Sequence, residues 1–173
     1  MGLKLEIVGL ECKVPEEIVS FLHSEIPSMN IEVHEIRDAS KIKERSYDPS
    51  RGQYNAELIL IELSKFRKKR ELILGIMEGD LFVRGFNFVF GLASPKLGAG
   101  LVSIHRLGSG EILVERLKKE VLHEIGHLLG LKHCSDPKCV MYFSNTVRDT
   151  DEKDAKFCPM CSRSMMMAFS NEV

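Results

Sequence analysis

The chain contains the sequence His123-Glu124-Ile125-Gly126-His127-Leu128-Leu129-Gly130-Leu131-Lys132-His133. Residues four positions apart on a helix lie on the same face, so His123 and His127 can present ring nitrogens to one zinc ion at about 2.0–2.1 Å. Gly130 can adopt a positive φ, which ends the helix and turns the chain so that His133 supplies a third ligand. Three protein ligands leave a fourth position open, and an open position is typical of a catalytic zinc site.

The glutamate of this motif is a candidate general base. A zinc ion held by three neutral imidazoles keeps its positive charge and lowers the pKa of a bound water toward about 7. Glu124 can then accept the proton from that water. A single histidine would more often be a hydrogen-bonded core residue, but three at this spacing, with Glu124 and Gly130 in place, favour a metal site.

The cysteines that follow indicate a second metal site. Four of them stand at ligand spacing: Cys134, Cys139, Cys158 and Cys161. Successive side chains of an extended segment point to opposite sides, so His133 and Cys134 can serve two ions placed back to back. Four thiolates form a closed tetrahedral site without room for a substrate. The alternative is a set of unrelated thiols, but the paired spacings predict two zinc ions per chain, one catalytic and one structural.

Composition places the chain among ordinary globular proteins. It has 173 residues, 44% of them hydrophobic and 28% charged, with a formal net charge of −1. This length suits one domain over residues 1–173, and the small net charge gives no attraction to nucleic acid or to a membrane surface. The amino terminus has no signal-peptide pattern and no apolar run could span a bilayer, so we expect a cytoplasmic location. Thiols stay reduced there, and the fifth cysteine, Cys12, is expected to be an idle thiol.

Hydrophobic periodicity predicts alternating strands and helices. Strands are expected at residues 3–8, 30–37, 71–77, 87–93 and 101–107, with 71–77 and 87–93 as central strands and 101–107 as an edge strand. Helices are expected at residues 15–26, 54–67, 111–129 and 151–169, a surface loop at 39–52 and a polar turn region at 144–156. The order indicates the α/β class, with a twisted mixed sheet backed by helices and the site in a cleft below it.

The motif HExxHxxGxxH is the signature of the metzincin metallopeptidases, in which a methionine turn follows the motif helix. Met141 supplies that methionine. Three further features resemble one branch in particular, the archaemetzincins or archaelysins: Cys134 directly after His133, Cys139 two residues before the methionine, and the pair Cys158-Pro159-Met160-Cys161. The resemblance in specific motifs covers roughly residues 120–161.

This resemblance implies a single metzincin-like domain with an active-site helix, a methionine turn and a zinc-bound, cysteine-rich C-terminal segment. Met141 would lie beneath the ligands as a hydrophobic floor, out of reach of the metal. A substrate peptide would extend along the edge strand, here residues 100–105, as an added strand. His105 is expected to be a surface or hydrogen-bonding residue rather than a ligand. Tyr142 and Phe143 can shape the pocket for the side chain after the scissile bond, but ordinary packing explains them equally well.

The sequence therefore favours a zinc metallopeptidase of the archaemetzincin type that hydrolyses peptide or protein substrates. The alternative is a catalytically weak or inactive, zinc-stabilised protein that binds peptides in the same cleft, because a motif identifies ligands more safely than turnover. Zinc-dependent hydrolysis of a non-peptide amide is a third hypothesis. The pattern predicts neither the cleavage mode nor the oligomeric state.

Overall fold

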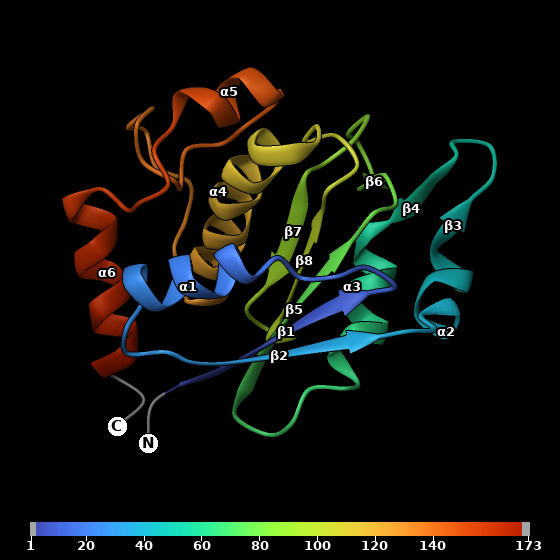
Figure 1. Ribbon diagram of the computed structural model, residues 1–173, viewed down its shortest axis with the longest axis horizontal. Helices are drawn as coiled ribbons and strands as arrows, with labels where there is room; N and C mark the ends of the chain where they lie inside the picture. The colour runs from blue at the N-terminus through green and yellow to red at the C-terminus, as the bar shows by residue number, and fades with distance from the viewer. Residues whose placement is uncertain (1–2, 171–173) are drawn as a thin grey trace.

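The computed structural model describes residues 3–170 as alternating strands and helices (Figure 1). In chain order the elements are β1 (Lys4–Leu10), α1 (Glu16–Glu25), β2 (Asn30–Ile36), α2 (Ser40–Lys43), the 3-10 helix η1 (Glu44–Ser46), β3 (Tyr47–Asp48), β4 (Gln53–Asn55), α3 (Ala56–Ser64), β5 (Glu71–Met77), β6 (Leu81–Phe82), β7 (Gly91–Ser94), β8 (Ala99–Ser103), α4 (Gly110–Leu128), α5 (Val147–Glu152) and α6 (Pro159–Ser170). None of the helices in this part of the chain is long and apolar enough to cross a membrane.

Five strands form the main sheet, in the order β2-β1-β5-β8-β7. β1 lies between β2 and β5 and is parallel to both. In this register Leu5 pairs with Ile31 of β2 and with Leu72 of β5. β8 continues the parallel arrangement, whereas β7 runs antiparallel to β8. The sheet is therefore mixed, as the sequence predicts. A second, smaller sheet has the order β3-β4-β6.

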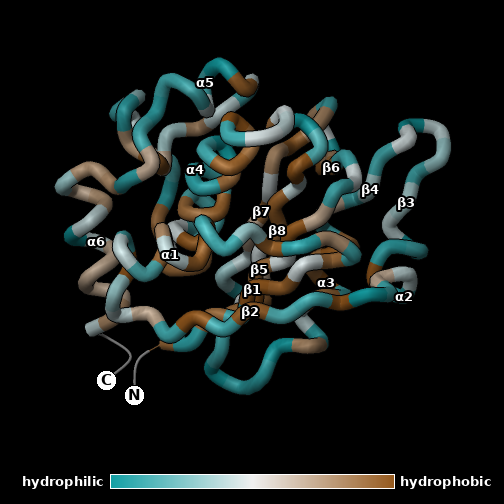
Figure 2. The backbone as a smooth tube through the Cα atoms, viewed as in Figure 1, coloured by the Kyte–Doolittle hydropathy of each residue, from teal (hydrophilic) through white to brown (hydrophobic). Residues whose placement is uncertain are grey.

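Helices cover both faces of the main sheet (Figure 1). On one face, Ile18 of α1 and Val121 of α4 belong to the same buried cluster as Leu74 of β5. On the other face, Ile59 of α3 is buried with Leu101 of β8. Figure 2 shows the hydrophobic colour concentrated along the central strands and the helix surfaces that face them. Burial of each such aliphatic side chain contributes about 1.5–3 kcal/mol, so the sheet and α4 form one firm support for the site.

The predicted positions of two strands in the sheet are wrong. The segment expected at the edge, 101–107, overlaps β8, which lies between β5 and β7, and the segment expected in the centre, 87–93, overlaps the edge strand β7. All five residues of β8 are buried because its small residues allow helices to pack closely on both faces. The segment 87–93 is apolar because side chains such as Phe88 and Leu92 line a cleft, and not because the strand lies in the centre of the sheet.

Three further segments differ from the prediction. The expected surface loop at 39–52 contains α2, η1 and β3, and its Ile42 is buried. The polar turn region at 144–156 contains α5, which begins with a capping box between Thr146 and Asp149. The helix expected at 151–169 is split, because residues 153–158 are irregular and α6 starts at Pro159, a residue that favours the first helical position. The other predicted elements are present with bounds shifted by a few residues.

Candidate active site and metal centres

The carboxyl end of α4 positions the three histidines of the motif. His123 and His127 are one turn apart on the helix, which ends at Leu128. Gly130 then adopts a φ of +86°, and its N–H donates to the carbonyl of His127 at 2.9 Å. This glycine-dependent helix end turns the chain back and brings His133 beside the other two rings, as the sequence argument requires.

The histidine nitrogens converge on one point. Nε2 of His127 lies 3.1 Å from Nε2 of His123 and 3.2 Å from Nε2 of His133. Two nitrogens bound to one zinc ion at about 2.0–2.1 Å and a tetrahedral angle would stand about 3.3 Å apart. The three rings therefore already have the spacing of a zinc ligand set, and they fit the ion that the motif predicts.

Main-chain carbonyls orient two of the rings. Nδ1 of His123 lies 2.7 Å from the carbonyl oxygen of Val140, and Nδ1 of His127 lies 2.8 Å from that of Leu131. A carbonyl can only accept, so each Nδ1 carries the proton and each Nε2 keeps its lone pair. Burial lowers the pKa of His123 well below its ordinary value and also lowers the pKa values of His127 and His133. The rings are thus neutral and ready to bind a cation.

The glutamate of the motif is buried beside these rings. Only 4% of Glu124 is exposed, and its Oε2 is buried without a hydrogen-bond partner among residues 3–170. Burial, together with the nearby charge of Glu120, raises the pKa of the Glu124 carboxyl well above its ordinary value. A carboxylate in this setting is a stronger base than an exposed one, and its free oxygen can accept a hydrogen bond from a water or a substrate.

Met141 lies directly against the active-site helix. The side chain is fully buried, and its sulfur occupies the space that a β-carbon on Gly126 would need. The main-chain N–H of Cys134 donates to the Met141 carbonyl at 3.0 Å. The methionine therefore packs against the active-site helix and is hydrogen-bonded to the start of the cysteine segment. Its role as a floor beneath the ligands stays a prediction.

The four C-terminal cysteines form a second cluster. The sulfurs of Cys134, Cys139, Cys158 and Cys161 lie within 4.8 Å of one another. Those of Cys134 and Cys158 are 3.9 Å apart, close to the spacing of about 3.8 Å for two thiolates bound tetrahedrally to zinc. The sulfur of Cys139 accepts main-chain N–H bonds from Met141 and Cys158. This cluster fits a closed metal site and ties the methionine turn to the start of α6.

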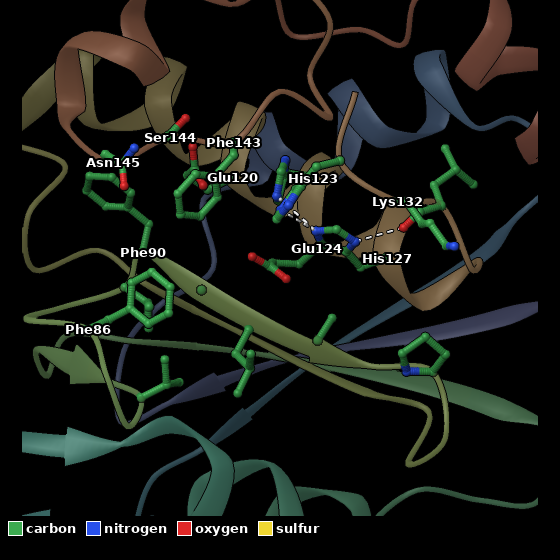
Figure 3. A pocket seen from close by; sticks show the side chains of 18 of the residues that line it. Phe86, Phe90, Glu120, His123, Glu124, His127, Lys132, Phe143, Ser144 and Asn145 are labelled. Atoms are coloured by element: carbon green, nitrogen blue, oxygen red, sulfur yellow. Dashed lines mark hydrogen bonds between the residues drawn. The ribbon is translucent and has the colours of Figure 1, made fainter. Parts of the chain in front are cut away.

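A cleft of about 430 Å³ runs between β7 and the end of α4 (Figure 3). Aromatic residues gather at one end of the cleft. The ring centroids of Phe86 and Phe143 are 6.4 Å apart, and those of Phe143 and His133 are 5.0 Å apart. Lys132 lies toward the other end. Phe143 is among the lining residues of the cleft, whereas Tyr142 is not. A role for Phe143 in the pocket after the scissile bond stays a prediction. His105 is exposed and is not part of the histidine cluster.

Sequence reasoning missed several residues around this cleft. Gly91 of β7 lies directly against Glu124, and Glu120, which lines the cleft, forms a buried ion pair with Lys153. Of these residues, only Glu120 could have been recognised from the sequence, because its position four residues before Glu124 places it on the same helix face. The other contacts join segments that are far apart in the sequence.

A cleft beside three converging imidazoles and a buried glutamate defines a zinc metallohydrolase. A sequence model of peptidase family M54 matches residues 11–167. The chain is 39% identical to the archaemetzincin of Pyrococcus furiosus over 88% of each chain, and 44% identical to that of Thermococcus kodakarensis over 70% of each. The chain therefore belongs to peptidase family M54 and is a zinc metallopeptidase of the archaemetzincin type.

Solved structures show the same fold. The crystal structure of the Methanopyrus kandleri archaemetzincin superimposes with a TM-score of 0.86 at 31% identity, over 98% of this chain and 96% of that one. The archaemetzincin of Archaeoglobus fulgidus, crystallised with malonate, gives a TM-score of 0.76 at 35% identity, over 94% of this chain and 99% of that one. A zinc-dependent peptidase from Methanocorpusculum labreanum gives 0.76 at 32% identity, over 92% and 99%.

Proposed function

We propose that this protein is a metzincin that hydrolyses peptide bonds, with His123, His127 and His133 as ligands of a catalytic zinc ion and Glu124 as general base. One observation carries the proposal. The Nε2 atoms of three imidazoles converge, and hydrogen bonds at Nδ1 leave those of His123 and His127 unprotonated. Beside them lies the buried Glu124 carboxyl group, whose Oε2 has no hydrogen-bond partner among the described residues, at the wall of an open cleft.

Each group of residues has a separate role in the proposed reaction. Zinc, when bound, supplies a Lewis acid that polarises water and the substrate carbonyl. Glu124 accepts a proton from the attacking water and passes it to the departing amine. The carbonyls of Val140 and Leu131 keep the rings of His123 and His127 in their ligating tautomer. Phe86 and Phe143 narrow one end of the cleft and favour an apolar substrate side chain there.

The substrate strand is placed on β7 rather than on residues 100–105. β8 pairs with β5 on one side and β7 on the other, so its backbone groups are already used. β7 ends the main sheet and lines the cleft through Gly91, Leu92 and Ala93. An extended peptide can add to this edge, and its carbonyl then lies between β7 and the histidines.

The cysteine cluster is proposed to hold a second, structural zinc ion, which gives two ions per chain. The four thiols are close enough for one tetrahedral site, and none of them is among the residues that line the cleft. The metal would connect the loop after α4 to α6, in a segment with few buried aliphatic side chains. Metal analysis of the purified protein should give two zinc ions per chain, and a value of one would contradict this division.

Peptide cleavage is the direct test. The zinc-loaded protein is incubated with a mixed peptide library and the products are identified by mass spectrometry, beside Glu124→Gln, which keeps the size of the side chain but removes the base. We expect cleavage by the wild type and a loss of about 10²–10⁴-fold in the variant, with metal content unchanged. Equal product formation by both proteins would exclude the proposed base.

The same experiment separates the alternative function. A zinc-stabilised peptide-binding protein would retain peptides without converting them, and Glu124→Gln would leave that binding unchanged. The buried, unpartnered oxygen of Glu124 favours hydrolysis over binding alone, because burial of an unused carboxylate is costly. A non-peptide amide tested beside the peptide library distinguishes the third hypothesis.

The remaining expectations are part of the proposal. We propose one domain over residues 1–173, a cytoplasmic location, and peptide or protein substrates without nucleic-acid or membrane partners; the oligomeric state is not assigned. The formal net charge of −1 supports the absence of polyanion binding. Retention of the protein on immobilised nucleic acid or on anionic vesicles at about 0.15 M salt would contradict it.

A further inference from the structure

A buried ion pair lies beside the proposed catalytic site. Lys153 is 1% exposed, and its Nζ lies 3.1 Å from Oε1 of Glu120, which is 3% exposed. The same Oε1 accepts a hydrogen bond from the Thr150 hydroxyl at 3.0 Å, and Nζ of Lys153 donates to the carbonyl of Tyr142 at 3.5 Å. Lysine and glutamate are almost never fully buried unless they are paired, so this arrangement requires an explanation.

The pair is placed between the active-site helix and the methionine turn. Glu120 belongs to α4, three residues before His123, and it is one of the residues that line the cleft (Figure 3). Lys153 follows α5 and reaches the main chain next to Met141. The ammonium group therefore joins the two segments that hold the histidines from either side.

A positive charge in this place opposes the binding of a cation. Glu120 lines the same cleft as His123 and His127, and the Nζ of Lys153 lies 3.1 Å from the Oε1 of Glu120. The buried ammonium is therefore one side chain away from the lining of the proposed zinc site. Two like charges in a low-dielectric interior repel each other strongly, so an uncompensated ammonium would weaken metal binding.

We propose that Glu120 is a charge-compensating residue of the metal site, which offsets the buried ammonium of Lys153 and so allows the histidines to hold a dication. This inference rests on the proposed function of the three histidines. Stability alone does not account for the pair, because replacement of a buried ion pair by apolar groups of similar volume is often neutral or stabilising. Lys153 ties the methionine turn to α4, and Glu120 cancels the charge that this tie introduces.

The test compares Glu120→Gln, Lys153→Met and the double variant that carries both changes. Metal-free protein is titrated with Co²⁺, whose visible d–d bands report the histidine site and whose thiolate charge-transfer bands report the cysteine cluster. A matched control is Asp151→Asn, because Asp151 and Arg116 form another ion pair between α5 and α4, but Asp151 is exposed. We expect the control to bind Co²⁺ within about twofold of the wild type.

Charge compensation predicts a specific order of affinities. Glu120→Gln should weaken Co²⁺ binding at the histidine site by about tenfold or more, whereas Lys153→Met should not weaken it. The double variant has lost both partners and yet should return to within about threefold of the wild type. A structural role predicts the opposite order, with the double variant weakest, and that result would overturn the proposal, as would unchanged binding in Glu120→Gln.

Folding is monitored independently in each variant by circular dichroism and by the charge-transfer bands of the cysteine cluster. Should Glu120→Gln fail to fold, the double variant decides, because compensation requires it to fold and to bind Co²⁺ normally. Failure of the proposed function has a different result. In that case the wild type itself would bind no Co²⁺ at the histidine site or would cleave no peptide.

Discussion

Gly91 of β7 lies so close to Glu124 of α4 that residue 91 has no room for a side chain. A β-carbon there would stand 2.7 Å from Oε1 of Glu124 and 2.9 Å from its Cγ. The edge strand therefore sets the position of the glutamate from the side opposite the histidines. The strand that we propose to bind the substrate also fixes the proposed general base.

Gly91→Ala is expected to displace Glu124 and to lower kcat. The added methyl group meets both the Glu124 side chain and the main-chain carbonyl of Leu101, so both β7 and the carboxylate must shift. Small misplacements of a catalytic group reduce the rate by about tenfold or more. Metal content should stay at the wild-type value, because the nearest atoms to a β-carbon at residue 91 belong to Glu124 and Leu101 and not to a histidine. Steady-state kinetics with a cleaved peptide, beside metal analysis of the same sample, checks this. An unchanged kcat would show that the carboxylate position is not set by β7.

Asp80 anchors the aromatic end of the cleft. It accepts two hydrogen bonds from Arg106, at 2.8 and 2.7 Å, and one from Gln53, whose amide also donates to the carbonyl of Asn87. Arg106 in turn lies over the ring of Phe88, 4.1 Å from its centroid. Asp80→Asn should loosen this loop and raise KM several-fold while kcat changes less. A decrease in kcat as large as the increase in KM would show that Asp80 acts on the catalytic groups and not mainly on the substrate-binding loop.

The same carboxylate gives a pH dependence of stability. Burial raises the pKa of Asp80, but the hydrogen bonds from Arg106 and Gln53 outweigh it and leave the pKa below its ordinary value of 3.8. The stabilisation is therefore complete above about pH 4 and is lost as the pH falls through the folded-state pKa. The difference in unfolding free energy between the wild type and Asp80→Asn should shrink below about pH 3.8. A constant difference at all pH values would contradict it.

Cys161→Ser is expected to remove one zinc ion per chain and to lower the melting temperature. The change leaves three thiols in a cluster that needs four, while the histidines are untouched. Metal analysis and thermal unfolding provide the measurement, and Cys12→Ser is the matched control with both ions retained. Loss of both ions from Cys161→Ser at room temperature would mean that the two sites are not separable.

Cys12 should react slowly with alkylating reagents near neutral pH. Its thiol donates to the carbonyl of Ile76 at 3.2 Å, and burial raises its pKa to about 11. At pH 8 only about 0.1% is thiolate, so the rate should rise about tenfold for each pH unit up to pH 10. Mass spectrometry of the alkylated peptide measures this rate in the zinc-loaded protein. Modification at pH 8 as fast as that of an exposed thiol would exclude the raised pKa.

Local rules allowed much of the candidate site to be predicted. The spacing of His123 and His127 has a fixed meaning on a helix, and Gly130 marks the helix end that returns His133. The cysteine pairs are equally local, because a metal knuckle is formed by residues a few positions apart. The order of the strands was harder, since β7 is apolar for its contact with the cleft and so resembles a central strand.

The sequence by itself predicted the two clusters of candidate metal ligands, the active-site helix and the α/β class, because each follows from periodicity or spacing within one segment. The tertiary structure decided which strand forms the edge, and it brought Gly91 against Glu124 and Lys153 against Glu120. These relationships join residues more than 30 positions apart in the chain. They depend on how helices and strands pack, which no local pattern specifies.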